Sequence, residues 1–200
     1  MLKALTLAIA CLAATPAVAA AEWHFTPMAG WSFRGSTTLI DVEEGTTKTH
    51  RQIGGSVALL GDGLFGAEVI GVFVPRFFQQ DNQDVLETGR TYALMGNVVV
   101  AAPRRWTEYS LRPFVSGGLG LMRASAIDDL FPLPVNVNLT GINVGIGAIG
   151  FLSARTGIRF DLRYYRTLRR TDQGAVSIDP VDGRVDLRYF TGSIGLVLRR

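Results

Sequence analysis

The sequence has little of several things on which many proteins rely. It contains one cysteine and two histidines, so no disulfide can form within the chain and few side chains suit a metal site or a base active near pH 7. No apolar run of about 20 residues, the length of a membrane-spanning helix, follows the N-terminal segment. The basic residues are scattered, without a cluster that would favour nucleic acid. These shortages argue against a redox protein, a helical membrane protein and a nucleic-acid-binding protein.

The first 21 residues have the features of a secretory signal. Lys3 supplies a positive charge, a short apolar stretch follows, and Ala17-Val18-Ala19 provides the small residues of a cleavage site. We therefore expect a signal peptide over residues 1–21 and one exported domain over residues 22–200. Lipidation of Cys11 is an alternative that the residues before it fit poorly.

The chain is nevertheless rich in apolar residues and glycine. Hydrophobic residues make up 48%, charged residues make up 18%, and 23 residues are glycine. The mean hydropathy is +0.23, which is high for a soluble domain. Hydrophobicity that is spread over many short segments is typical of a membrane β-barrel.

The clearest of these segments is Thr156–Leu168, which alternates without a break. One face carries Ile158, Phe160, Leu162 and Tyr164, and the other carries Arg159, Asp161, Arg163 and Tyr165. Because side chains of a strand alternate between its two faces, this pattern predicts a strand with one apolar face and one ionic face.

Seven further segments alternate in a similar way, so the chain has about eight candidate strands. They are Glu22–Phe33, His50–Leu60, Leu64–Val74, Arg90–Ala101, Leu111–Arg123, Gly141–Phe151, Thr156–Leu168 and Val185–Leu198. Each is close to the roughly 9–11 residues that a tilted strand needs to cross a bilayer. The connections alternate between long and short. This rhythm predicts an all-β fold, an eight-stranded antiparallel up-and-down transmembrane β-barrel with short periplasmic turns and long external loops.

The distribution of charge indicates which face points outward. The apolar faces carry no charge in the central part of any strand, whereas the opposite faces carry Glu68, Arg112, Arg159, Asp161 and Arg163. An arginine or lysine that faces lipid at mid-membrane costs roughly 2–4 kcal/mol. We therefore expect the apolar face against lipid and these five residues in a lumen ionic network, where two carboxylates neutralise two of the arginines. A soluble cup with an apolar interior is the structural alternative, and a gated ion path is the functional one.

The chain resembles the small outer-membrane β-barrel family, which includes the transmembrane domain of outer-membrane protein A, the W-type porins and the opacity-type surface adhesins. The resemblance covers the mature chain and rests on Gly-rich strands such as Phe114–Gly120 and on the closing strand Thr191–Leu198. It implies a bacterial outer-membrane location, contact with outer-membrane lipid and lipopolysaccharide, insertion by the barrel assembly machinery, and a monomer. Many members end on an aromatic residue, whereas this chain ends Leu198-Arg199-Arg200.

Few residues are candidates for catalysis or metal binding. His24 and His50 are predicted near opposite ends of the barrel, and the nearest interior serine to His50, Ser56, lies about 20 Å along the same strand. Asp179, Asp182 and Asp186 match no calcium-loop spacing. We therefore expect no catalytic residue, no cofactor and no metal.

One predicted external loop contains residues that could bind another molecule. Leu130, Phe131, Leu133 and Val135 form an apolar stretch, and an exposed apolar patch often marks a binding site. The alternative is that this stretch folds onto the barrel mouth. We predict a non-enzymatic outer-membrane barrel with a structural or surface-interaction role. The alternatives are a narrow channel or porter for ions or small hydrophobic solutes and, third, a lipid-modifying enzyme.

Overall fold

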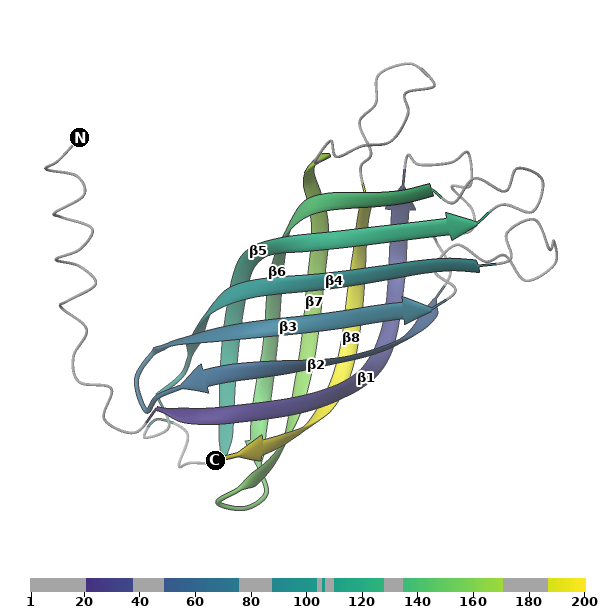
Figure 1. The fold of residues 1–200 in the computed structure, drawn as a ribbon. Helices are drawn as coiled ribbons and strands as arrows, with labels where there is room; N and C mark the ends of the chain where they lie inside the picture. The colour runs from purple at the N-terminus through teal and green to yellow at the C-terminus, as the bar shows by residue number, and fades with distance from the viewer. Residues whose placement is uncertain are drawn as a thin grey trace, which may run out of the picture.

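The computed structural model describes residues 21–37, 49–75, 88–103, 106, 110–127, 135–170 and 187–200. Eight antiparallel strands form a closed barrel in chain order, and β8 pairs with β1 (Figure 1). The strands are β1 (Glu22–Thr37), β2 (His50–Leu60), β3 (Phe65–Pro75), β4 (Thr88–Ala101), β5 (Leu111–Ile127), β6 (Val135–Phe151), β7 (Thr156–Arg170) and β8 (Leu187–Arg199). Within the described ranges no helix is long and apolar enough to span a membrane. The predicted fold class is confirmed.

The two ends of the barrel differ. The connections 61–64, 102–110 and 152–155 are short and lie at the end that we call the turn end. The first and last strands meet there, because the backbone N–H of Trp23 donates to the carbonyl of Arg200 and the N–H of Arg200 donates to the carbonyl of Trp23, each at 3.0 Å. The other four connections, 38–49, 76–87, 128–134 and 171–186, leave from the opposite end, the loop end (Figure 1). Short and long connections alternate as predicted except at 128–134, whose seven residues are fewer than the nine of 102–110, because β5 and β6 extend beyond their expected ends.

The strands turn their apolar faces outward, as predicted. On β7, Phe160 is 56% exposed and Leu162 is 44% exposed, whereas Arg159 and Asp161, which alternate with them, are buried. The large exposed apolar side chains of the other strands follow the same rule, from Trp23 on β1 to Leu198 on β8. The barrel is therefore the reverse of a soluble cup in its membrane-spanning part.

Several strands are longer at the loop end than the sequence predicted. β5 runs to Ile127 and β6 starts at Val135, where a loop was expected over residues 124–140. The ladder continues there through pairs such as Ala124 with Val137. The expected strand ends followed the limit of the apolar outward face, but backbone pairing needs no lipid and continues beside polar side chains.

β1 is also longer than predicted, and it passes through a bulge. The β1–β8 register shifts between Phe33 and Ser36, and Arg34 has a φ of 52°. The alternation pattern predicted a strand that ends at Phe33. A β-bulge re-aims a strand without ending its pairing, so the strand resumes and reaches Thr37.

Candidate functional site: an ionic layer across the barrel interior

Four of the five charged residues predicted for the lumen meet in one cluster, which we call the ionic layer. It consists of Glu68 from β3 and of Arg159, Asp161 and Arg163 from β7, and all four are buried. Residues two apart on a strand share a face, so β7 alone presents three charges in a row. Glu68 approaches them from the opposite wall, because β3 and β7 are four strands apart in the ring of eight.

Each guanidinium of the ionic layer binds both carboxylates. Arg159 donates through Nη1 to Glu68 Oε1 and through Nη2 to Asp161 Oδ2, which lies at 2.6 Å. Arg163 Nη2 donates to Glu68 Oε2 at 3.1 Å and to Asp161 Oδ2 at 3.0 Å. Two positive and two negative groups give the layer a formal charge of zero. This balance offsets the cost of burial, because an unpaired charge inside a protein costs several kcal/mol.

Two asparagines complete a ring of hydrogen bonds beside these charges. Arg163 Nη1 donates to Asn143 Oδ1 at 2.7 Å, Asn143 Nδ2 donates to Asn97 Oδ1 at 2.7 Å, and Asn97 Nδ2 donates to Glu68 Oε2 at 3.3 Å. Since Glu68 also binds Arg163, the ring is closed. Period-two alternation places both asparagines on the inner faces of their strands, opposite the apolar outward faces, but it predicts no role for them. The two asparagines occupy matching positions on β4 and β6, with only β5 between them. This placement was the signal from which their contact could have been predicted.

Gly118 allows the two asparagines to meet. It lies on β5 between them, paired with Asn97 on one side and with Asn143 on the other. A Cβ at this position would overlap the carbonyl oxygen of Gly96 and Asn97 Oδ1. The absence of a side chain on β5 therefore leaves the room in which the amides of β4 and β6 bond across it.

Arg112, the fifth predicted member, lies at the turn end instead. Its Nη2 donates to the carbonyls of Gly61 and Gly63, each at 2.8 Å, and its Nε donates to the carbonyl of Ala102 at 3.0 Å. The expected grouping of Arg112 with the ionic layer is thus corrected. Inner-face alternation predicts that a charge points inward, but it does not predict at which height of the barrel the charge finds its partners.

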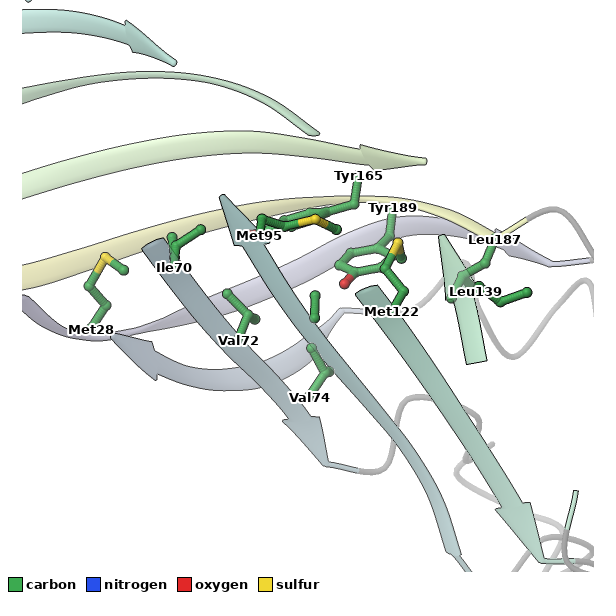
Figure 2. Packing of buried hydrophobic residues seen from close by; sticks show 11 residues of the cluster. Met28, Ile70, Val72, Val74, Met95, Met122, Leu139, Tyr165, Leu187 and Tyr189 are labelled. Atoms are coloured by element: carbon green, nitrogen blue, oxygen red, sulfur yellow. The ribbon is translucent and has the colours of Figure 1, made fainter. Parts of the chain in front are cut away.

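Apolar layers cover the ionic layer on both sides. Toward the loop end lies an upper apolar cluster of Met28, Ile70, Val72, Val74, Ala93, Met95, Met122, Leu139, Tyr165, Leu187 and Tyr189 (Figure 2). Toward the turn end lies a lower apolar cluster of Ala58, Leu60, Val99, Ala101, Phe114, Ile149 and Val197. Members of the three layers are at most 8% exposed. Such packing fills the described part of the interior with side chains.

Aromatic contacts join these layers. The guanidinium carbon of Arg159 lies 4.4 Å from the centre of the Phe114 ring, a cation–π contact between the ionic layer and the lower cluster. In the upper cluster the rings of Tyr165 and Tyr189 stack with their centres 5.0 Å apart, and Figure 2 shows both pointing into the interior. Side-chain packing therefore continues from the lower apolar cluster through the ionic layer to the upper apolar cluster.

The exterior has the pattern that a bilayer requires. Exposed apolar side chains cover the middle of the wall, with Trp23 and Phe65 near the turn end and Trp31 and Tyr92 near the loop end. Beyond them, at the loop end, exposed arginines occur on five strands: Arg51, Arg90, Arg123, Arg166 and Arg188. Aromatic rings at the membrane interface and cations at headgroup level are typical of a lipid-embedded wall.

Solved structures with this architecture are outer-membrane proteins. Neisserial surface protein A superposes with a TM-score of 0.59 at 12% identity over 88% of this chain and 96% of its own. The chain has the fold of the small outer-membrane β-barrels. The attachment invasion locus protein Ail of Yersinia pestis (TM-score 0.54, 12% identity, 90% and 99% covered) and OprG of Pseudomonas aeruginosa (0.54, 11%, 90% and 96%) share it. No family model and no curated protein sequence matches the chain.

These three barrels come from the bacterial outer membrane, which supports the predicted location. Their names describe surface, attachment and outer-membrane proteins, and they do not assign one role to the fold. The fold alone therefore does not define the role of this chain.

The two histidines are at opposite ends of the barrel. His24 pairs with Ala58 near the turn end, while His50 pairs with Ser32 near the loop end. His24 Nε2 lies 3.6 Å from Glu22 Oε2, and the same carboxylate binds Arg199 at 2.8 Å. This separation prevents the two imidazoles from serving one catalytic centre.

The other candidate residues concern metal binding and surface interaction. No group of three or more metal-ligating side chains occurs among the described residues. The three aspartates considered for calcium, Asp179, Asp182 and Asp186, lie outside the described ranges. So do Leu130, Phe131 and Leu133 of the predicted interaction loop, and for Val135 the structure describes only the backbone that opens β6.

Proposed function

We propose that the protein is an integral, non-catalytic barrel of the bacterial outer membrane, a closed scaffold that holds four loops at the cell surface for a structural or surface-interaction role. The observation that carries the proposal is the neutral ionic layer enclosed between two apolar clusters. An interior filled in this way favours a scaffold over a conduit. Contact with outer-membrane lipid and lipopolysaccharide, insertion by the barrel assembly machinery and a monomeric state are parts of the same proposal.

Electrical recording separates this scaffold from the alternative of a narrow channel. The full barrel is reconstituted into planar lipid bilayers, with a general porin treated identically as the positive control. We expect no steady current from the wild type and none from Arg159→Lys or Arg163→Lys. Steady current steps whose size changes in either variant would establish the channel instead, because these two residues cross the middle of the lumen.

Heat-modifiability tests the proposed location and assembly. Outer-membrane fractions are run on a detergent gel with and without boiling. We expect the protein in the outer-membrane fraction, with a folded form that migrates differently from the boiled form. A soluble periplasmic protein without a mobility shift would overturn the proposal.

The surface-interaction role rests on the predicted loop and on the character of the related folds. Ail is named for attachment and invasion, and one of its structures holds the heparin analogue sucrose octasulfate. For this chain the apolar stretch with Leu130, Phe131 and Leu133 is the proposed contact. Replacing these three residues with serine is expected to lower adhesion of expressing cells to hydrophobic beads without changing the heat-modified gel shift. A matched set of serine substitutions at Asp179, Asp182 and Asp186, in another external loop, serves as the control, and equal loss from both sets would remove the assignment.

A further inference from the structure

A groove of about 600 Å³ lies on the outside of the wall near the loop end. It spans strands β2 to β6, most of which face the viewer in Figure 1. Ile53, Leu94 and Leu121 form apolar walls, and Gly71 leaves the hollow between them. A Cβ on Gly71 would meet only the Cδ1 atom of Leu94, at 3.9 Å. The hollow therefore exists because this outward position has no side chain.

The groove changes character toward the loop end. Phe73 and Tyr92 stack with their ring centres 4.6 Å apart and form its aromatic side. Arg123 and Asn138 line the end nearest the external rim, where the register places Tyr92, Arg123 and Asn138 side by side on β4, β5 and β6. The site is thus apolar in the membrane and cationic at the level where aromatic residues mark the interface.

Rigid walls of this kind favour one bound molecule over loosely attached lipid. The groove is already formed by packed strands, so an acyl chain that enters it orders little protein. A guanidinium at the top matches the geometry of a phosphate, which it can bind through two parallel hydrogen bonds. The long loops leave from this end, which in such barrels is the external side, so the lipid that reaches the groove belongs to the outer leaflet.

We propose that this groove binds one lipid A moiety of lipopolysaccharide, with an acyl chain between Leu94 and Leu121 and a phosphate at Arg123. The inference rests on the outer-membrane location proposed above and adds a specific site to it. Charge complementarity selects the occupant: a phosphorylated headgroup suits Arg123, whereas a two-fold contact between copies centred on this end of the groove would bring two Arg123 side chains together.

Native mass spectrometry of the full barrel in detergent micelles tests the site, with purified lipid A as the probe. Gly71→Val fills the hollow at a position where a Cβ meets only Leu94 Cδ1, and Gly71→Ala is a milder variant in case valine impairs folding. Gly117→Val is the matched control, because it is also outward-facing, is not part of the groove and would place its Cβ 3.6 Å from the nearest atom. Arg123→Gln removes the cation, and Arg188→Gln is its control at the rim.

We expect Gly71→Val to weaken lipid A binding about tenfold, since displaced methylenes lose their apolar contact. Arg123→Gln should weaken binding about fivefold, as expected for one partly exposed ion pair, and should remove the preference for lipid A over its dephosphorylated form. Both controls should bind as the wild type does. Gel mobility with and without boiling checks that each variant is folded.

Three results would overturn the inference. The first is unchanged binding by Gly71→Val and Arg123→Gln, or equal weakening by their controls. The second is equally tight binding of phosphatidylglycerol, which would remove the assignment to lipid A. The third is a wild-type dimer that Gly71→Val dissociates while lipid A binding stays constant, which would make the groove a self-association face. Because the assay uses micelles, its failure is distinguishable from a failure of the outer-membrane location, which fractionation tests.

Discussion

Arg159 on β7 and Glu68 on β3 form an ion pair across the barrel, although the two residues are 91 positions apart in the sequence. Every backbone ladder in the wall joins only neighbouring strands. The Arg159–Glu68 pair instead joins opposite sides of the ring. It therefore resists flattening of the cross-section, which the backbone hydrogen bonds alone resist only weakly.

Neutralising Glu68 should destabilise the barrel strongly. In Glu68→Gln, two guanidinium groups share a single carboxylate, that of Asp161, and a buried ion pair that loses one partner typically costs about 3–5 kcal/mol. The free energy of unfolding, measured by urea titration in lipid vesicles, should fall by that amount. Asp62→Asn, an exposed change in the turn 61–64, is the control and should leave stability within about 0.5 kcal/mol.

Restoring the charge balance should recover part of this loss. In Glu68→Gln/Arg159→Met, one carboxylate and one guanidinium remain, namely Asp161 and Arg163, and these two already bond to each other. We expect the double variant to be more stable than Glu68→Gln alone, with a coupling of about 1–3 kcal/mol. Additive losses would mean that the charges do not act as one unit.

A methyl group at Gly118 should break the asparagine bridge. The Cβ of Gly118→Ala would meet the backbone of Gly96 and the amide of Asn97, and overpacking of this kind typically costs about 1–3 kcal/mol. Gly96→Ala is the matched control on the neighbouring strand, because its Cβ would have only an ordinary contact with the carbonyl of Leu119 at 3.9 Å. Equal stability of the two variants would show that the Asn97–Asn143 contact does not need the space.

Removing Arg112 should loosen the turn end without affecting the ionic layer. Arg112→Leu leaves the carbonyls of Gly61, Gly63 and Ala102 without their charged donor. A hydrogen bond to a charged group contributes about 1.5–3 kcal/mol. Hydrogen exchange should rise at residues 61–66 and stay unchanged near Asn143. Arg112→Lys keeps the charge but cannot span three carbonyls, so it should show an intermediate effect.

The bulge in β1 should accept glycine at position 34 but not valine. Arg34 has a φ of 52°, a conformation that costs a non-glycine residue roughly 1–2 kcal/mol and is worst for β-branched side chains. Arg34→Val is expected to lower the unfolding midpoint and Arg34→Gly to leave it equal or higher. Arg51→Val, at an exposed strand position that pairs with Trp31, controls for the loss of the arginine. A loss of stability in Arg51→Val as large as that in Arg34→Val would show that backbone strain is not the cause.

The strands of the wall and the direction of their side chains could be predicted from the sequence. The contacts between side chains inside the barrel could not. Period-two alternation and the exclusion of charge from one face fix which way each residue points, and Trp23, Phe160 and Glu68 all follow the prediction. These rules are local. They depend on the residue's own strand and on the solvent that the face meets.

The height in the barrel at which two inward residues meet is not determined by the sequence of either strand alone. The position of Arg112 at the turn end and the ring through Asn97 and Asn143 depend on the stagger between strands far apart in the sequence. Hydrophobicity gives no signal for this stagger. The upper apolar cluster was not predicted for a related reason: alternation places Tyr165 on the inner face of β7, but Tyr165 stacks on Tyr189 only because β7 and β8 pair the two residues directly.

The unequal strand lengths give the barrel a slanted rim. β5 and β6 have 17 residues each, whereas β2 and β3 have 11 each. The ladder register aligns Phe65 of β3 with Val115 of β5 and Pro75 with Ser125, so β5 exceeds β3 by four residues at the turn end and by two residues at the loop end. At a rise of about 3.3 Å per residue and a tilt of about 40°, two residues correspond to roughly 5 Å of height. Among the described residues, the rim of the wall is therefore higher at β5 and β6 than at β2 and β3. A rim of unequal height has a direction, so the orientation of the barrel about its own axis decides which neighbour the high side faces.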